Sequence, residues 1–392
     1  MQVAVIGGGA SGLSAAIAAS ARHKVTVFEK NDKVGKKLLA TGNGRCNLTN
    51  SKIGSMTDNK KFYNNEFAYK IIQAYPFREV ISFFDGIGLE VRLDEDGRVY
   101  PFTEQAVSVL DVLRCKCIQN GVKFYTGSRI DQIRKEENKF VLISGGTEYV
   151  FDKLIFAPGS SVQSKNYNGL ELAGQLGLKL TKLSPALCPI SIEKPLSVLN
   201  GIRIKCQALL FSSDGEIARE DGEILFRNYG ISGIAVFNLS SYIARDNVAN
   251  IKTEYYVMLD LFPDLPYNML LAKMQRRLGH CNNKNFFVGL LPIQVANEIL
   301  KYATLKEVNE KNIEKVVFAM KNWKHRIIGL CEEETCQVMS GGIDTAQILP
   351  DFSVKDCEGL YVIGEVLDVD GLCGGFNLHF AFISGLIAGV RV

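Results

Sequence analysis

VAVIGGGASG, residues 3–12, is the stretch that decides the fold of this chain. Its four apolar residues predict a buried strand, and the glycines that follow predict a tight turn leading into a helix. In a Gly-x-Gly-x-x-Gly spacing, Gly7 permits the turn, Gly9 lets the backbone approach a pyrophosphate, and Gly12 lets helix and strand pack closely. The first turn of the helix then offers N–H groups to phosphate oxygens.

A second predicted strand, residues 25–28, follows the alanine-rich helix and ends in Glu29. An acidic side chain about 20 residues beyond the glycines accepts a hydrogen bond from a ribose hydroxyl, and it disfavours a 2′-phosphate. The sequence therefore predicts tightly held FAD or NAD rather than NADP. The alternative is a glycine-rich surface turn, which does not explain the flanking strand, helix and carboxylate.

A second motif lies near the C-terminus. Residues 359–365 predict a buried strand ending in Gly364 and Glu365, and Gly374-Gly375 opens a last helix over about 377–390. In flavoproteins with two dinucleotide-binding domains, a carboxylate at this point binds the ribitol chain of FAD. The following helix N-terminus stabilises negative charge on the reduced flavin. Together with the N-terminal motif this favours FAD. The alternatives are a surface carboxylate and a flexible turn.

The stretch GKKLLATGNGRCNLTN, residues 35–50, is expected to cross the cofactor. Lys37 and Arg45 are candidates to neutralise the pyrophosphate, and Cys46 to lie near the isoalloxazine ring. Ser51 stands five residues after Cys46, where a disulfide reductase has its second cysteine. We therefore expect no dithiol relay.

Length and composition limit the classes of protein. A chain of 392 residues with 47% hydrophobic residues is long and apolar enough for two or three globular domains. Its apolar runs are too short for a membrane span, and its N-terminus lacks the charged segment of a signal peptide, so we expect a cytoplasmic protein. The ten cysteines contain no C-x-x-C and the four histidines do not cluster. We expect reduced thiols and no metal site.

The patterns divide the chain into three modules. Residues 1–185 and 336–392 form a split dinucleotide-binding domain, with helices at 66–88 and 104–120 and short strands over 122–157. Alternating apolar residues and Asp-Gly turns predict a β-rich, barrel-like module. It covers 186–262 and 322–335, with a helical subdomain at 263–321.

The helical region is basic, with 11 Lys and Arg against 5 Asp and Glu over residues 261–330. It is either a face for an anionic partner such as RNA or an ordinary solvated surface. The candidate RNA contacts are Lys273, Arg276, Arg277, Lys284, Lys321, Lys324 and Arg326.

Four motifs together resemble the BaiN/RdsA family of bacterial flavoproteins. They are GNGRCNLTN (42–50), GRVYP (97–101), ILF with GISG (224–233), and GEVLDVDGLCGGFNL (364–378). The resemblance covers essentially the whole chain. It implies an α/β, Rossmann-like two-dinucleotide-binding-domain FAD fold, interrupted by a β-barrel module with a helical subdomain.

The resemblance also implies the FAD contacts. They are Gly7, Gly9, Ala10, Ser11, Gly12, Glu29, Lys30, Lys37, Arg45, Cys46, Asn47, Gly364, Glu365, Gly375, Phe376 and Asn377. We add Ile130, on a strand usual for adenine contact, and Ala157, Gly159 and Gly374 beside the same motifs.

Two segments depart from the family pattern. Residues 157–160 read Ala-Pro-Gly-Ser where the family usually has Ala-Thr-Gly-Gly. His379 replaces a usual Gln, and Phe380 replaces a usual Trp. His379 is either a substrate contact or a satisfied polar residue at the start of a helix.

Members of the family are linked to reduction of conjugated C=C bonds in 3-oxo bile acids, to dihydrouridine formation in ribosomal RNA and, more distantly, to aminoacetone oxidation. We expect an FAD-dependent reductase of a small α,β-unsaturated substrate, with NAD(P)H as transient reductant and Cys46 or Asp368 as proton donor. Alternatives are a ribosomal RNA dihydrouridine synthase, an amine oxidase and a non-catalytic flavin-binding module. The sequence leaves the substrate, the reductant and the oligomeric state open.

Overall fold

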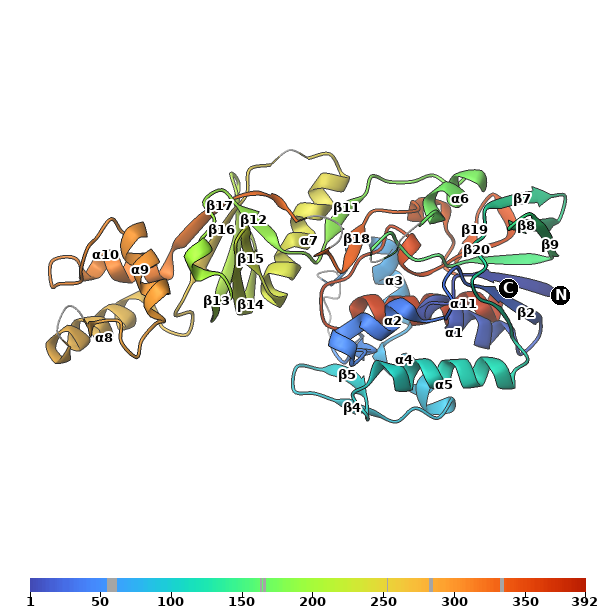
Figure 1. Cartoon of the computed structure of the whole chain (residues 1–392), viewed down its shortest axis with the longest axis horizontal. Helices are drawn as coiled ribbons and strands as arrows, with labels where there is room; N and C mark the ends of the chain where they lie inside the picture. The colour runs from blue at the N-terminus through green and yellow to red at the C-terminus, as the bar shows by residue number, and fades with distance from the viewer. Residues whose placement is uncertain (55–61, 163, 165–166, 252, 282–284, 332–334) are drawn as a thin grey trace. The chain divides into compact units, whose positions relative to one another are not determined.

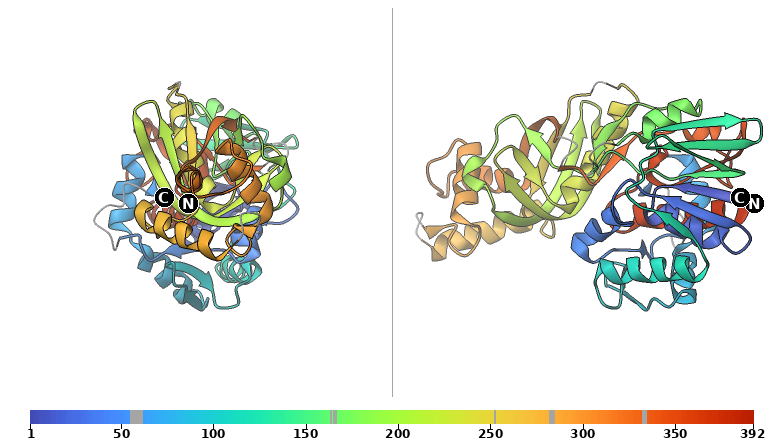
Figure 2. Two further views of the ribbon diagram at one scale, coloured as in Figure 1. Left: turned by 90° about the vertical axis from the view of Figure 1, so that its left-hand side faces the viewer. Right: turned by 45° about the vertical axis from the view of Figure 1, so that its right-hand side comes forward.

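The chain folds into two compact units (Figure 1). Unit 1 comprises Met1–Ser184 and Val338–Val392, and unit 2 comprises Pro185–Gln337. The two chain ends lie side by side in both views of Figure 2. His23 Nε2 lies 2.9 Å from the backbone oxygen of Val392. The computed structural model describes residues 1–54, 62–162, 164, 167–251, 253–281, 285–331 and 335–392.

A six-stranded sheet in the order β19-β20-β10-β1-β2-β6 forms the centre of unit 1. The pairs β20–β10, β10–β1, β1–β2 and β2–β6 are parallel, and β19 is antiparallel to β20. Ligands of such sheets bind beyond the carboxyl ends of the parallel strands. The strands are β1 (Gln2–Ile6), β2 (Lys24–Phe28), β6 (Lys123–Tyr125), β10 (Lys153–Phe156), β19 (Ser353–Val354) and β20 (Cys357–Val362).

Helices α1 (Ala10–Ala19) and α11 (Phe376–Arg391) pack closely against each other. A Cβ atom at Gly385 of α11 would lie 2.2 Å from Ser14 Oγ and 2.3 Å from the carbonyl oxygen of Ser11. The small residues of α1 and the glycines of α11 therefore allow the two helices to touch. The other helices of unit 1 are α2 (Lys36–Ala40), α3 (Glu66–Ala74), α4 (Phe77–Gly86), α5 (Ala106–Gln119) and α6 (Gly169–Gln175), with 3₁₀ turns η1 (Thr41–Gly44), η6 (Thr345–Gln347) and η7 (Gly364–Val366).

The helical structure expected over 66–88 is confirmed, but it consists of two helices, α3 and α4. Pro76 has extended backbone at the N-cap of α4, and its ring cannot continue α3. The helix expected over 104–120 is confirmed as α5, which ends where Gly121 has φ +75°. Three small sheets lie outside the central sheet. The first contains β3 (Thr49–Asn50), β5 (Arg98–Pro101) and β4 (Val91–Leu93), and the second contains β7 (Gln132–Glu136), β8 (Lys139–Ser144) and β9 (Thr147–Phe151). The third pairs β11 (Ser184–Ala186) with β18 (Val338–Ser340).

Unit 2 contains a closed barrel in the order β12-β15-β14-β13-β16-β17, so the barrel expected from the alternating pattern is confirmed. Its interior includes Trp323, whose ring centroid lies 5.6 Å from that of Phe226. Helix α7 (Ile234–Val248) packs on β14 and was not expected. The barrel strands are β12 (Ile190–Ile192), β13 (Arg203–Ser212), β14 (Gly215–Arg227), β15 (Gly230–Ser232), β16 (Tyr256–Asp260) and β17 (Trp323–Leu330), with η3 (Ser197–Leu199).

Three further helices of unit 2 stand between β16 and β17: α8 (Tyr267–His280), α9 (Ile293–Tyr302) and α10 (Ile313–Lys321). Hydrogen bonds from Lys321 link the end of α10 to the end of β16. Its Nζ donates to Asp260 Oδ2 at 2.7 Å and to the carbonyl of Phe262 at 2.8 Å. Within the described ranges, no helix has the length and apolar character needed to span a bilayer.

Candidate functional site

The glycine loop after β1 is built as a phosphate-binding turn. Gly7 has φ +100°, and its N–H donates to the carbonyl of Phe28 at 2.8 Å. A Cβ at Gly12 would lie 1.9 Å from the carbonyl oxygen of Gly7, whereas a Cβ at Gly9 would meet nothing within 4 Å. Gly9 is the N-cap of α1, with no side-chain cap and no acidic residue in the first turn. The first-turn N–H groups of α1, which include those of Ala10 and Ser11, therefore have no side-chain cap, and a side chain at Gly9 would meet no neighbour.

Glu29 directly follows β2 and is hydrogen-bonded to the glycine loop. Its side chain is buried, with Oε2 accepting from the N–H of Gly8 at 2.9 Å. Oε1 accepts from the backbone N–H and the side-chain amide of Asn31, at 2.9 and 2.6 Å. A carboxylate can accept about four hydrogen bonds, so Glu29 retains capacity for a ribose hydroxyl. Sequence reasoning missed Asn31, although an Asn two residues after a site carboxylate is a turn signal.

Lys30 and Ile130 lie at the same end of the site. Lys30 Nζ donates to Ser164 Oγ at 2.6 Å and lies 5.4 Å from the ring centroid of Tyr167; burial lowers the pKa of Lys30. The segment leading to the buried Ile130 runs beside Glu29, since the N–H of Ser128 donates to the Glu29 carbonyl at 2.9 Å.

The loop after β10 supports the glycine turn. The N–H of Ala157 donates to the carbonyl of Ile6 at 2.9 Å, and a Cβ at Gly7 would lie 2.1 Å from the Ala157 oxygen. Gly159 has φ +72°, and its carbonyl accepts from the hydroxyl of Tyr167 at 2.7 Å.

Lys37 and Glu365 meet directly. Lys37 Nζ donates to Glu365 Oε2 at 2.7 Å and to Ser160 Oγ at 3.0 Å. Ser160 Oγ donates to Glu365 Oε1 at 3.0 Å. Gly364 has φ +75°, and a Cβ there would lie 2.4 Å from Ser11 Oγ. Ser160 was not among the expected cofactor contacts; its replacement of a family glycine was the available signal.

Arg45 lies outside this polar network. Its guanidinium stacks on the ring of Tyr100, 4.7 Å from the centroid, and NH1 is 3.7 Å from Glu104 Oε2. The Arg45 side chain is 48% exposed. The structure thus groups Arg45 with β5 rather than with Lys37 and Glu365.

Cys46 and Asn47 pack inside the next turn. Cys46 is completely buried with φ +59°, and burial raises the pKa of its thiol to about 12. Asn47 Oδ1 accepts from the N–H of Val99 at 3.2 Å and would lie 2.8 Å from a Cβ at Gly375. The Cys46 segment therefore lies against the start of α11.

The N-terminus of α11 is the second uncapped helix end of the site. Gly375 is its N-cap with φ +98°, no side-chain cap and no acidic residue in the first turn. Asn50 Nδ2 donates to the Gly374 carbonyl at 2.9 Å, and the side chain of Asn377 turns back to bond Gly371. Phe376 stacks on Phe62 with centroids 4.4 Å apart.

Asp368 is half-buried in the loop before α11. Its Oδ1 accepts from Asn64 Nδ2 at 2.9 Å. Burial raises its pKa, and hydrogen bonds from the Thr181 hydroxyl, the Asn64 amide and the Gly341 N–H oppose that rise.

His379 is a satisfied core histidine. It is completely buried, with Nε2 3.0 Å from the carbonyl of Tyr75 and Nδ1 2.9 Å from Thr49 Oγ1. Because the carbonyl only accepts, Nε2 carries the proton and Nδ1 accepts from the hydroxyl. Burial lowers the pKa of His379 to about 4. Both ring nitrogens are engaged by protein, which favours the structural interpretation of this residue.

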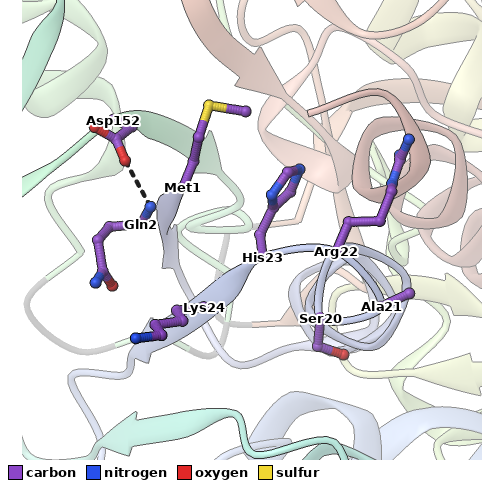
Figure 3. A pocket seen from close by; sticks show the side chains of 8 residues that line it. All are labelled: Met1, Gln2, Ser20, Ala21, Arg22, His23, Lys24 and Asp152. Carbon is purple, nitrogen blue, oxygen red and sulfur yellow. Dashed lines mark hydrogen bonds between the residues drawn. The ribbon is translucent and has the colours of Figure 1, made fainter.

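A surface hollow lies near the amino ends of the parallel strands (Figure 3). The residues that line it are Met1, Gln2, Ser20, Ala21, Arg22, His23, Lys24 and Asp152, and Gln2 N–H donates to Asp152 Oδ2 at 2.6 Å. These residues stand at the amino ends of β1 and β2, so the hollow is separate from the glycine loop.

Several basic residues expected to contact RNA are engaged within unit 2. Arg277 donates to the carbonyls of Phe286 and Val288, and Lys321 holds Asp260. Arg326 pairs with Glu193 and Glu254 at 3.0 and 2.7 Å. Lys273, Arg276 and Lys324 are exposed, and Lys284 lies outside the described residues.

Sequence comparison finds relatives along the whole chain. The model described as HI0933-like protein Rossmann domain matches residues 1–391. A 3-dehydro-bile acid delta(4,6)-reductase of Clostridium scindens is 31% identical over 99% of this chain and 98% of its own length. A ribosomal RNA dihydrouridine synthase of Escherichia coli is 26% identical over 97% of this chain and 95% of its own.

Solved structures share the fold at low sequence identity. A 3-ketosteroid-delta4-(5alpha)-dehydrogenase from Rhodococcus jostii aligns with a TM-score of 0.52 and 14% identity, covering 99% of this chain and 95% of its own. A 3-ketosteroid delta1-dehydrogenase from Sterolibacterium denitrificans gives a TM-score of 0.50 and 13% identity, covering 99% and 98%. Identity this low supports the fold alone.

Proposed function

Since this chain belongs to the HI0933-like family, whose Rossmann-like fold is an FAD-binding one, we propose that it is an FAD-dependent oxidoreductase that saturates an activated C=C bond. This agrees with the resemblance found in its motifs. The substrate class is an α,β-unsaturated ketone such as a 3-oxo bile acid or steroid. The observation that carries the proposal is the 31% identity to a 3-dehydro-bile acid reductase over nearly the full length of both chains.

The residues present fit FAD. The open space beside Gly9 faces the uncapped N-terminus of α1, which suits a diphosphate. Glu29 is anchored on the glycine loop with accepting capacity left for a ribose, and Glu365 stands after β20 where a ribitol chain would bind. The uncapped N-terminus of α11 suits the electron-rich pyrimidine edge of a flavin.

When bound and reduced, FAD would supply the hydride that an activated C=C bond accepts at its β-carbon. The chain must then provide a proton for the α-carbon. We favour Asp368 over Cys46, because an acid works best when its pKa lies near the working pH. Burial raises the pKa of Asp368 toward that range and moves the pKa of Cys46 away from it, to about 12.

We propose NAD(P)H as the reductant. The sequence contains only one Gly-x-Gly-x-x-Gly strand–turn–helix motif, which FAD would occupy, so NAD(P)H would bind only transiently. Anaerobic reduction with NADH or NADPH, followed by reoxidation with 3-oxo-Δ4 steroids, RNA or oxygen, tests the whole proposal. We expect the enone to reoxidise the enzyme fastest and to be recovered as the saturated ketone. Reoxidation by oxygen alone, or no reduction by either nucleotide, contradicts this.

Ribosomal RNA is the second candidate substrate, favoured by the full-length similarity to a dihydrouridine synthase. Its reduction is the same chemistry on a much larger substrate. Charge reversal of the exposed Lys273, Arg276 and Lys324 should then abolish RNA reduction and leave FAD content unchanged. Loss of a dihydrouridine from ribosomal RNA on gene deletion would favour this candidate over the enone.

The Asp368→Asn variant should slow enone-dependent reoxidation about 100-fold and leave flavin reduction by NAD(P)H within about twofold of wild type. The amide keeps the shape but cannot donate an acidic proton, and general acids contribute about 100-fold or more. Stopped-flow absorbance measures both half-reactions. Asp351→Asn is the matched control, because its carboxylate accepts from Ser353 and is not among the groups that shift the pKa of Asp368. Equal slowing in both variants contradicts the proton-donor role.

A further inference from the structure

Three polar side chains meet above the glycine loop although they come from distant segments. Lys37 follows β2, Ser160 follows β10, and Glu365 follows β20. In the strand order β20-β10-β1-β2, the strand β1 stands between β10 and β2. The Lys37–Ser160–Glu365 network therefore crosses the carboxyl end of β1, where the loop from Gly7 to Gly9 begins.

Ser160 completes the hydrogen bonding of the other two groups. Its Oγ accepts from Lys37 Nζ at 3.0 Å and donates its single proton to Glu365 Oε1 at 3.0 Å. Lys37 Nζ donates to the other carboxylate oxygen at 2.7 Å. Each oxygen of Glu365 thus has one donor, and the plane of the carboxylate is fixed from two sides.

Ser160 is the buried member of the network, whereas Lys37 and Glu365 are partly exposed. The Tyr167 hydroxyl, 2.7 Å from the Gly159 carbonyl, holds the backbone immediately before Ser160. A partly exposed Lys–Glu ion pair restrains its two long side chains only weakly. The buried Ser160 hydroxyl is bonded to both Lys37 and Glu365, and it therefore restricts the orientation of both side chains.

We propose that Ser160 is a positioning residue of the cofactor site, which orients the Glu365 carboxylate and the Lys37 ammonium for the ribitol and diphosphate of FAD. This rests on the FAD binding proposed above. Ser160 acts through Glu365 and Lys37 and not as a direct contact.

An isosteric pair of variants isolates the hydroxyl. Ser160→Thr keeps the hydroxyl and Ser160→Val replaces it with a methyl group of the same shape, so both carry the same steric cost. Titration of apoprotein with FAD, followed by quenching of flavin fluorescence, should show the Val variant binding about tenfold more weakly than the Thr variant. If the two larger variants fold poorly, Ser160→Ala, which adds no bulk, should bind FAD about tenfold more weakly than wild type. Ser20→Ala, at the far end of α1, should bind like wild type.

Repeating the Thr and Val comparison in a Glu365→Ala protein shows whether the loss of FAD affinity depends on Glu365. With Glu365→Ala, the Thr-to-Val difference should fall below about threefold, because the acceptor of the Ser160 proton is gone. A tenfold difference that persists there, or equal affinities in the wild-type background, overturns the positioning role while FAD binding stands. A wild-type apoprotein that binds no FAD overturns both proposals.

Discussion

The Gly9→Ala variant should fold like wild type and yet bind FAD at least about 1000-fold more weakly. The added Cβ meets nothing within 4 Å, and Gly9 has φ −85°, which alanine tolerates. The methyl group would nevertheless occupy the space that the first-turn N–H groups of α1 face. Loss of two charge-assisted hydrogen bonds to phosphate costs about 4 kcal/mol, which is roughly 1000-fold in affinity. Thermal unfolding of the apoprotein and FAD titration measure the two properties separately.

Two other glycines serve as controls. A Cβ at Gly174 in α6 also meets nothing within 4 Å, so Gly174→Ala should leave FAD affinity unchanged and should not lower the stability of the apoprotein. Gly12→Ala places a Cβ 1.9 Å from a backbone oxygen and should destabilise the apoprotein itself. If Gly9→Ala retains FAD, the diphosphate does not bind at this loop.

Acidification should destabilise each unit through one histidine, the completely buried His379 in unit 1 and the partly buried His325 in unit 2. Burial lowers the pKa of His379 in unit 1 and of His325 in unit 2 from 6.5 to about 4. The unfolded chain therefore takes up the proton first as the pH falls below about 6.5. The contribution of each neutral histidine to the free energy of unfolding is complete above about pH 6.5. It is lost progressively as the pH falls toward 4, by about 3 kcal/mol per histidine.

Denaturant unfolding at pH 7 and pH 4.5 measures this loss. His325 Nε2 has no hydrogen-bond partner among the described residues, so His325→Phe should remove the acid sensitivity of unit 2 at little cost at pH 7. His379→Gln can still donate to Tyr75 and accept from Thr49, and it should do the same for unit 1. Variants that lose as much stability as wild type on acidification would assign the effect to carboxyl groups.

The local parts of the fold could be predicted because their signals lie within a few residues. The strand, glycine turn and helix of residues 2–19 are a continuous motif, and α5 ends at its Asn-Gly signal as expected. Helix α7 was missed because its buried face includes Asn238, Ser240 and Ser241, which hide the helical spacing of its apolar residues. The break at Pro76 was visible in the sequence and should have outweighed the apolar pattern around it.

The polar network was harder to predict because it is not local. Ser160 lies 123 residues from Lys37 and 205 from Glu365 along the chain. The sequence identified both charged residues separately as cofactor contacts. Only the strand order of the sheet shows that a third segment brings a hydroxyl between them.

The close packing of α1 on α11 has a consequence for biosynthesis. Ala19 ends α1 and Phe376 begins α11, so the ribosome adds about 357 residues (376 − 19) between them. At roughly 5–20 residues per second this takes about 20–70 s. During that time the alanine-rich face of the first helix lacks its partner, and unit 2 is synthesised in full. This face of α1 therefore stays uncovered by α11 until Phe376–Arg391 has been synthesised.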